Sequence, residues 1–162
     1  MMPIACEMTM TNPRPTPPPK SRRDRNDLQV ERRTPHILLA EDDFEMRGLL
    51  ADALRSRGYK VTEAVSGMDA LTRIGPAVYS GMEFEFDLII SDIRMPGVDG
   101  LEILAGMHRC EGAPPVILVT GFGDCQTHLH AERLGVVDLL DKPFEIDELY
   151  SVLRRVLPPP RD

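Results

Sequence analysis

The chain has 162 residues, 42% of them apolar and 5% aromatic, which fits one small α/β core, and we do not expect a second folded domain. Its net charge of −7 is uneven, because residues 1–34 hold seven basic and four acidic side chains, whereas residues 35–162 hold 12 and 22. The excess of acidic residues makes the predicted domain a poor candidate for direct DNA binding, and no apolar run approaches the ~18 residues of a membrane span.

The first 34 residues form an extension that is rich in proline and arginine and poor in apolar side chains. We expect this extension to be disordered, because it cannot bury enough apolar surface to order itself. It could dock on a partner, tether the protein to a polyanion, or have no role, and its composition favours the last.

Cysteine usage and the N-terminus indicate the cellular compartment. Cys6, Cys110 and Cys125 are odd in number and share no metal-ligand spacing, which is typical of free thiols in a reducing compartment. The N-terminus also lacks the apolar stretch of a signal peptide. A cytoplasmic location is therefore expected.

Short apolar runs alternate with helical patterns through the rest of the chain. The runs predict five strands, at residues 36–40, 60–64, 87–91, 115–119 and 136–140. Apolar residues at helical spacing predict a helix after each strand, and the first of these stops at Gly58. The expected buried positions in the first helix are Met46, Leu49, Leu50, Ala53 and Leu54, and in the last helix they are Ile146, Leu149, Leu153 and Val156. Strands that alternate with helices form a parallel sheet.

Two of the helices carry a weaker signal. The second is expected to break at Gly75-Pro76, with a broken helix and an extended loop over residues 76–86. The fourth has a thin apolar stripe, with Leu129 and Leu134 as its clearest members. A weakly held helix is suited to act as a switch.

Polar side chains stand at the carboxyl ends of four predicted strands. Glu41 and Asp42 follow the first strand, Asp92 the third and Thr120 the fourth, and Lys142 lies just beyond the fifth. In doubly wound sheets, ligands bind at this edge. Mg²⁺ prefers oxygen ligands and relieves the repulsion between carboxylates, so Asp42 and Asp92 are the expected ligand pair. Glu41 and Asp42 could instead complement the dipole of the first helix.

The residues around Asp92 and Thr120 suit the transfer of a phosphoryl group. Asp92 lies in SDIRMPGVDG, whose turn keeps the carboxylate at the sheet edge, where it can act as a nucleophile. The alternative of a helix cap fits Asp99 better. Gly121, which has no side chain, leaves a path for a phosphoryl group beside the hydroxyl of Thr120.

Lys142 supplies a positive charge at the same edge. It precedes Pro143, which favours an extended backbone and helps to aim the ammonium group at carboxylate or phosphate oxygens. Alternatively, Lys142 could be a surface lysine that lies over Phe144. His128, like two other histidines on predicted helices, is expected to lie away from the strand ends and to have a surface or packing role.

This combination and its spacing resemble the response regulator receiver domain of two-component signalling over about residues 35–157. The resemblance implies an α/β, doubly wound, flavodoxin-like fold, with a five-stranded parallel sheet in the order 2-1-3-4-5 and helices on both faces. It also implies that Asp92 is the phosphoacceptor, Thr120 the switch hydroxyl and Lys142 the residue that contacts the phosphoryl group. The ligands that it implies for Mg²⁺ are Glu41, Asp42, Asp92 and the main-chain carbonyl of Arg94.

Three features depart from the usual pattern of the family. The acidic pair and the phosphoacceptor are several positions farther apart than usual, which we attribute to an inserted loop within residues 75–86. Leu139 stands where the family often has an aromatic residue that follows the switch threonine, so an aromatic toggle cannot operate there. Arg94 and Phe122 occupy positions that tune loss of the phosphoryl group, and their bulk predicts slow self-dephosphorylation.

The expected function is that of a stand-alone response regulator. Asp92 would accept a phosphoryl group from the phosphohistidine of a histidine kinase or a histidine phosphotransfer protein. The surface of the fourth helix, fifth strand and last helix would then change and signal to a downstream protein partner or a phosphorelay. Only a short proline-rich tail, residues 158–162, follows, so no output domain, DNA binding or membrane association is expected.

Two other classes of function bear on this expectation. A receiver-like docking module would bind its partner in one fixed conformation, whether or not Asp92 is phosphorylated. An aspartate-nucleophile phosphatase would need a second carboxylate two positions after its nucleophile, where Arg94 stands. We therefore expect no enzyme activity beyond Mg²⁺-dependent self-phosphorylation and self-dephosphorylation.

Overall fold

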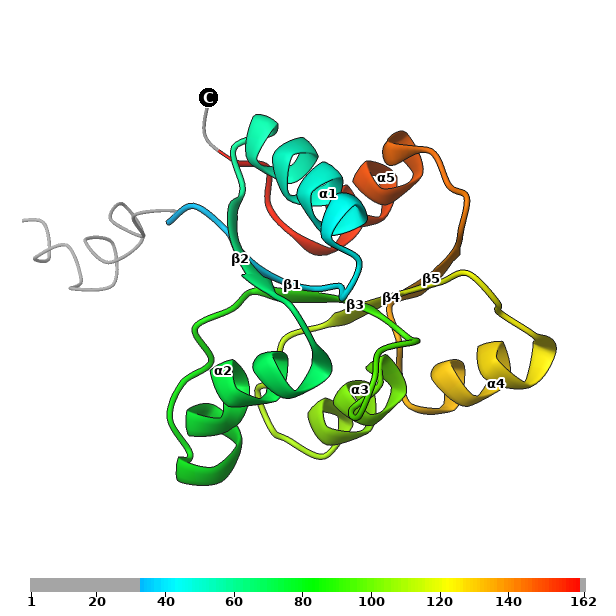
Figure 1. Cartoon of the computed structure of the whole chain (residues 1–162). Helices are drawn as coiled ribbons and strands as arrows, with labels where there is room; N and C mark the ends of the chain where they lie inside the picture. Colours follow the sequence, from blue (N-terminus) through cyan, green and yellow to red (C-terminus); the bar gives the residue numbers. More distant parts are fainter. Residues whose placement is uncertain (1–32, 161–162) are drawn as a thin grey trace, which may run out of the picture. The chain divides into compact units, whose positions relative to one another are not determined.

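The computed structural model of the protein describes residues 33–160, in which five strands form one parallel sheet (Figure 1). The strands are β1 (His36–Ala40), β2 (Lys60–Ala64), β3 (Leu88–Asp92), β4 (Val116–Thr120) and β5 (Asp138–Asp141). They lie in the order β2-β1-β3-β4-β5, and every neighbouring pair is parallel. The predicted doubly wound sheet and its strand order are confirmed.

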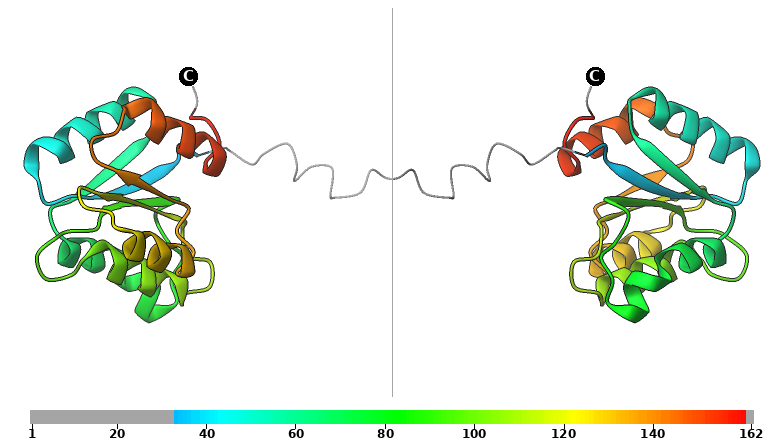
Figure 2. Two further views of the ribbon diagram at one scale, coloured as in Figure 1. Left: turned by 90° about the vertical axis from the view of Figure 1, so that its right-hand side faces the viewer. Right: turned by 90° about the vertical axis from the view of Figure 1, so that its left-hand side faces the viewer.

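Five helices cover the two faces of this sheet. They are α1 (Phe44–Ser56), α2 (Gly67–Ser80), α3 (Gly100–His108), α4 (Cys125–Arg133) and α5 (Ile146–Val156). Helices α1 and α5 pack on one face, and α2, α3 and α4 pack on the other (Figures 1 and 2). Because all strands are parallel, their carboxyl ends meet at one edge of the sheet.

The three central strands are buried on both faces, which is why they read as continuous apolar runs. In β1, Ile37 and Leu39 belong to a core beneath α1 and α5, which we call the α1/α5 core. Leu38 and Ala40 belong to a second core beneath the other three helices, the α2–α4 core. Packing from both sides therefore fixes the register of the strands and the positions of the residues at their ends.

Strands β3 and β4 end one residue later than the sequence pattern predicted. Asp92 and Thr120 are the last residues of these strands and not the first residues after them. Hydrogen bonds extend the sheet here, because the N–H of Ile93 donates to the carbonyl of Val119 at 2.8 Å. The N–H of Lys142 likewise donates to the carbonyl of Thr120 at 2.7 Å. The backbone at both positions is therefore held by the sheet itself.

Helix α2 runs through Pro76 without a break, so the predicted break at Gly75-Pro76 is wrong. A proline inside a helix removes one backbone hydrogen bond and crowds the preceding turn. Here Ile74 and Val78 lie one turn apart on either side of the proline, and both pack into the α2–α4 core. Their burial outweighs the missing bond. The irregular stretch therefore shrinks to residues 81–87.

Two leucines that were predicted to be buried are exposed instead. Leu49 of α1 is 66% exposed and Leu129 of α4 is 52% exposed. Leu50 and Leu54 still anchor α1 in its core. In α4, Ala131 is the one buried residue. The fourth helix is therefore held by little buried apolar surface, in agreement with the sequence pattern.

The predicted disordered extension, residues 1–34, lies outside the described residues except for its last two, and so do the last two residues of the predicted tail. Arg33 donates a hydrogen bond to Asp87 at 2.7 Å. Cys110 is partly buried and Cys125 is exposed, and both are free thiols. None of the helices that the structure describes is long and apolar enough to cross a membrane.

Candidate functional site

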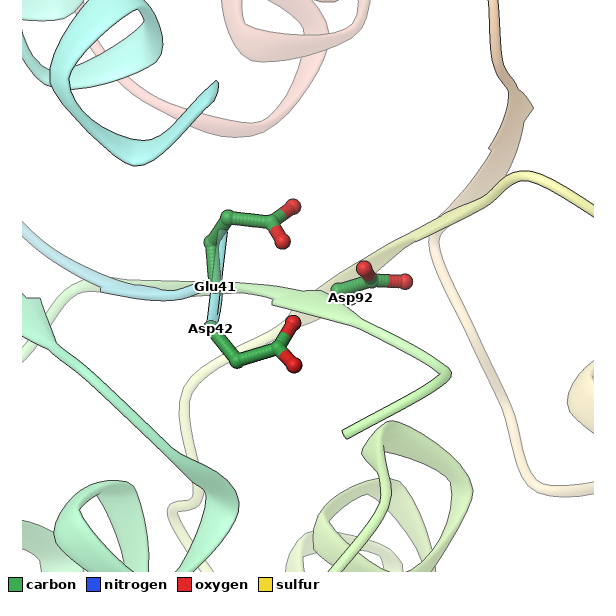
Figure 3. A group of neighbouring side chains, drawn as sticks. All are labelled: Glu41, Asp42 and Asp92. Carbon is green, nitrogen blue, oxygen red and sulfur yellow. The ribbon is translucent and has the colours of Figure 1, made fainter. Parts of the chain in front are cut away.

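Three carboxylates converge at the carboxyl end of the sheet (Figure 3). Glu41 and Asp42 follow β1, and Asp92 ends the neighbouring strand β3. One carboxylate oxygen of each residue lies within 4.8 Å of the other two. Glu41 and Asp92 are buried, whereas Asp42 is exposed. The strand order thus brings Asp42 and Asp92 together, although they are 50 positions apart in the sequence.

Lys142 reaches the same cluster from the end of β5. Its Nζ donates hydrogen bonds to Glu41 Oε2 at 2.9 Å and to Asp92 Oδ2 at 3.0 Å. Only 21% of the lysine side chain is exposed. The structure therefore places the ammonium group inside the pocket and not over Phe144 at the surface.

Burial and mutual contact shift the pKa of two groups in this cluster. Burial raises the pKa of Glu41 above its ordinary value, against the hydrogen bond from Lys142, and repulsion by Asp92 adds to the rise. Burial also opposes the charged form of Lys142, but hydrogen bonds to Glu41 and Asp92 outweigh it and raise the lysine pKa. Lys142 therefore stays protonated, and its one positive charge faces three carboxyl groups.

The main chain around Asp92 is held tightly. The N–H of Arg94 donates to Asp92 Oδ1 at 3.1 Å. A side chain on Gly100, the first residue of α3, would collide with the main-chain carbonyl of Asp92. Asp99 caps α3 with its side chain, the role that its sequence position suggested. Only glycine at position 100 lets α3 start directly against the strand end that carries Asp92.

Thr120 is almost fully buried, with 1% of its surface exposed. Its Oγ1 accepts a hydrogen bond from the N–H of Phe122 at 3.2 Å, so the hydroxyl is engaged by the loop that follows β4. Leu139, at the position where the family often has an aromatic residue, is partly buried and packs into the α2–α4 core. The loop after β4 is thus the direct neighbour of the threonine hydroxyl.

The side chains of Arg94 and Phe122 form a stack on the two loops that follow β3 and β4. The guanidinium carbon of Arg94 lies 4.7 Å from the centroid of the Phe122 ring. Phe122 is 72% exposed, so the pair forms an outer layer and not part of a core. A cation over an aromatic face is attracted by the ring electrons. The two bulky residues predicted to affect loss of a phosphoryl group therefore contact each other.

Two contacts of charged side chains near the site were not predicted from the sequence. Arg47 of α1 is buried and donates a hydrogen bond to the main-chain carbonyl of Glu41. The available signal was its position one helical turn before the buried residue Ala51. The prediction that His128 lies away from the strand ends is wrong, since its Nε2 is 3.2 Å from a carboxylate oxygen of Asp141, the last residue of β5. That contact depends on how α4 packs and has no local signal.

The family comparison agrees with this geometry. The family model of the response regulator receiver domain matches residues 37–154. The chain belongs to this family. Its receiver domain therefore has the fold, the acidic pocket and the strand-end lysine within one matched segment.

Known relatives of the receiver domain differ in length. It is 36% identical over 125 residues to the transcriptional regulatory protein FixJ of Bradyrhizobium diazoefficiens, a match that covers 75% of this chain but only 56% of FixJ. It is 31% identical over 125 residues to sporulation initiation phosphotransferase F of Bacillus subtilis, which covers 75% of this chain and 93% of that protein. Chemotaxis protein CheY4 of Vibrio cholerae has the same fold, with a TM-score of 0.66 at 28% identity over 77% of this chain and 100% of CheY4.

The donor set of this receiver domain fits Mg²⁺. Hard divalent cations take oxygen ligands, and Mg²⁺ is usually bound by one or two carboxylates with water and phosphate in the remaining positions. Glu41, Asp42 and Asp92 offer three carboxylates, of which the exposed Asp42 leaves the cluster open to solvent. Lys142 offsets only part of their charge. A bound divalent cation would therefore neutralise the negative charge of these carboxylates that Lys142 does not offset.

Proposed function

We propose that the receiver domain accepts a phosphoryl group on Asp92 from the phosphohistidine of a histidine kinase or a histidine phosphotransfer protein. A carboxylate oxygen of Asp92 attacks phosphorus, the P–N bond breaks, and the imidazole leaves with its electron pair, giving an acyl phosphate. The observation that carries this proposal is the convergence of three carboxylates and Lys142 Nζ at one strand edge.

Mg²⁺ would be held by Glu41, Asp42, Asp92 and the main-chain carbonyl of Arg94, and when bound it neutralises charge on the phosphoryl oxygens. Lys142 would supply the second positive charge. Its Nζ already bonds to Asp92 Oδ2 and needs only a small movement to contact an oxygen of the incoming group. Positioning and charge compensation thus account for the reaction.

Thr120 would act as the switch. Its hydroxyl accepts a hydrogen bond from the Phe122 N–H, and a phosphoryl group on Asp92 offers it a charged partner instead. Moving the hydroxyl would reorganise the loop after β4, and with it helix α4, which has little buried surface to hold it. The surface of α4, β5 and α5 would then contact a downstream protein or pass the phosphoryl group on.

An apolar groove beside the site supports the docking of a protein donor. It has a volume of about 360 Å³ and lies between α1 and the segment that joins β5 to α5. Lys142 lines it together with apolar side chains that include Leu49, which is 66% exposed, and Phe144. A partner that filled this groove would sit directly beside the pocket. The exposure of Leu49, unexpected for a core residue, fits such a contact.

The test is incubation of the full chain with a small acyl phosphate donor, with and without Mg²⁺, followed by intact-mass measurement. We expect a Mg²⁺-dependent phosphoryl adduct in the wild type and none in Asp92→Asn. Asp99→Asn is the matched control, because Asp99 is a nearby carboxylate that caps α3 and should leave the adduct intact. An adduct that persists in Asp92→Asn would disprove the assignment of the phosphoacceptor.

A docking module that ignores phosphorylation is the second candidate. Leu139 favours it, because a leucine packed into the α2–α4 core cannot act as the aromatic toggle common in the family. In that case Asp92→Asn and the wild type, with or without the acyl phosphate donor, would bind a downstream partner with the same affinity. A phosphorylation-dependent change in that affinity would exclude this alternative.

A further inference from the structure

Arg47 occupies an unusual environment in helix α1. Among the residues that the structure describes, it is the one lysine or arginine that is buried, with 9% of its side chain exposed. A charged group is costly to bury unless it is paired and its hydrogen bonds are satisfied. Its burial therefore calls for an explanation in terms of its partners.

The guanidinium group of Arg47 joins three elements. Its Nη1 donates to the main-chain carbonyl of Glu41 at 2.9 Å, and its Nε donates to Glu63 Oε2 on β2 at 3.3 Å. The other carboxylate oxygen of Glu63 pairs with Arg55, at 2.9 Å. Phe44 lies beside the guanidinium, 5.6 Å from ring centroid to the central carbon. The rigid fork of arginine thus ties α1 to the end of β1 and to β2.

The contact with Glu41 lies where the sheet stops. Strand β1 ends at Ala40, and the N–H of Glu41 still donates to the carbonyl of Ala64 at 3.2 Å. Arg47 supplies a donor for the carbonyl of Glu41 on the other side of this residue. That carbonyl belongs to the peptide that joins Glu41 to Asp42. Its orientation affects the backbone positions from which two of the three clustered carboxylates extend.

We propose that Arg47 is a positioning residue for the Mg²⁺ site: it fixes the Glu41–Asp42 peptide and so sets the affinity for the cation without touching it. The inference rests on the proposed function, in which these carboxylates bind Mg²⁺. Residues that orient metal ligands change metal affinity by about 10- to 100-fold when they are replaced. We expect an effect of about tenfold here, since the ligands themselves are retained.

The experiment is a calorimetric titration of the full-length chain with MgCl₂, together with urea unfolding in the absence of Mg²⁺. Arg47→Met keeps the length of the side chain and removes its donors, and we expect it to raise the Kd for Mg²⁺ about tenfold. Arg55→Met is the matched control, because Arg55 pairs with the same Glu63 but does not contact Glu41. Its Kd should equal that of the wild type.

Arg47→Lys is a second variant that can be measured if Arg47→Met does not fold. It keeps the charge but has a single point donor, which cannot bond Glu41 and Glu63 in the way that the fork does. We expect a several-fold rise in Kd, smaller than in Arg47→Met. An unchanged Kd in folded Arg47 variants, with or without a loss of stability, would overturn the proposal and leave Arg47 with a structural role only.

Asp42→Asn separates this proposal from the one on which it rests. If the wild type binds Mg²⁺ and Asp42→Asn binds it weakly, the metal site stands, and the Arg47 variants decide the role of Arg47. If the wild type does not bind Mg²⁺, or if Asp42→Asn binds it equally well, the metal site is wrong and the role of Arg47 falls with it.

Discussion

Lys142 is the one cation, among the described residues, whose side chain hydrogen-bonds the clustered carboxylates. Lys142→Met would leave Glu41 and Asp92 buried without this partner and would remove the positive charge that, in the proposed function, meets the phosphoryl group. We expect phosphorylation by a small acyl phosphate to slow by about a hundredfold, as for loss of one preorganised electrostatic donor. Intact mass against time measures the rate. Lys60→Met, at the exposed start of β2, is the control, and an equal rate in both variants would contradict the prediction.

The stack of Arg94 and Phe122 predicts the lifetime of the acyl phosphate. The two side chains lie on the loops that follow Asp92 and Thr120, so under the proposed function they would together restrict the approach of water to the phosphoryl group. Arg94→Ala should accelerate self-dephosphorylation, and so should Phe122→Ala, each by up to about fivefold, because an exposed cation–π pair contributes at most about 1 kcal/mol.

The Arg94→Ala/Phe122→Ala double variant shows whether the two side chains slow dephosphorylation together or independently. If the two side chains act together to exclude water, the double variant should lose its phosphoryl group little faster than either single variant. The decay of the phosphorylated mass in Mg²⁺, after removal of the donor, measures each rate. Multiplicative effects in the double variant would show that the residues act separately.

At the scale of elements, the loop between β4 and α4 is packed against the end of β5. A side chain on Gly123 would collide with Asp141 Oδ1 and approach His128 Nε2 and the methyl group of Thr120. The nearest of these atoms are the ends of side chains that can move aside, so we expect Gly123→Ala to lower the free energy of unfolding by only about 0.5–1 kcal/mol, through loss of the contact between His128 and Asp141. Gly121→Ala is a matched control in the same loop, since a side chain there meets no atom within 4 Å. Equal urea midpoints for the two variants would refute this packing.

The sequence predicted the elements of this fold correctly where a local pattern determines the structure. The predictions were wrong where packing between distant parts of the chain determines it. Asp92 and Thr120 could be assigned to strand ends because each closes an apolar run, and the structure shifts each by only one position. Helix α2 continues through Pro76 because burial on both sides outweighs a local rule. The contact of Arg47 with Glu41 could not be predicted, because it depends on how α1 lies over the end of β1.

At the scale of the whole molecule, His36 predicts a dependence of stability on pH. It is buried at the start of β1, with Nε2 2.7 Å from Thr62 Oγ1. Burial lowers the pKa of His36, Lys60 adds to the decrease, and Glu85 opposes it. The folded protein thus favours the neutral ring. This contribution is present above the unfolded pKa of about 6.5 and is lost as the pH falls from there toward the lower folded pKa.

Urea unfolding at several pH values between about 7.5 and 5 tests this dependence, within the range where histidine titrates. The wild type should lose stability toward the acidic end. His36→Phe, which cannot titrate, should lose less over the same interval, whatever its stability at neutral pH. His130→Gln, at an exposed position of α4, should keep the slope of the wild type. Parallel curves for the wild type and His36→Phe would rule out His36 as the cause.

The hydrogen bond between Lys142 and Glu41 joins residues that are 101 positions apart. The site therefore does not exist in any chain that ends before β5, even if β1 and β3 have already paired. During synthesis, domains form from the N-terminus onward, so the lysine is among the last parts of the site to arrive. Under the proposed function, the chain would therefore gain a complete phosphoryl-accepting site only once Lys142 has joined Glu41 and Asp92 at the sheet edge.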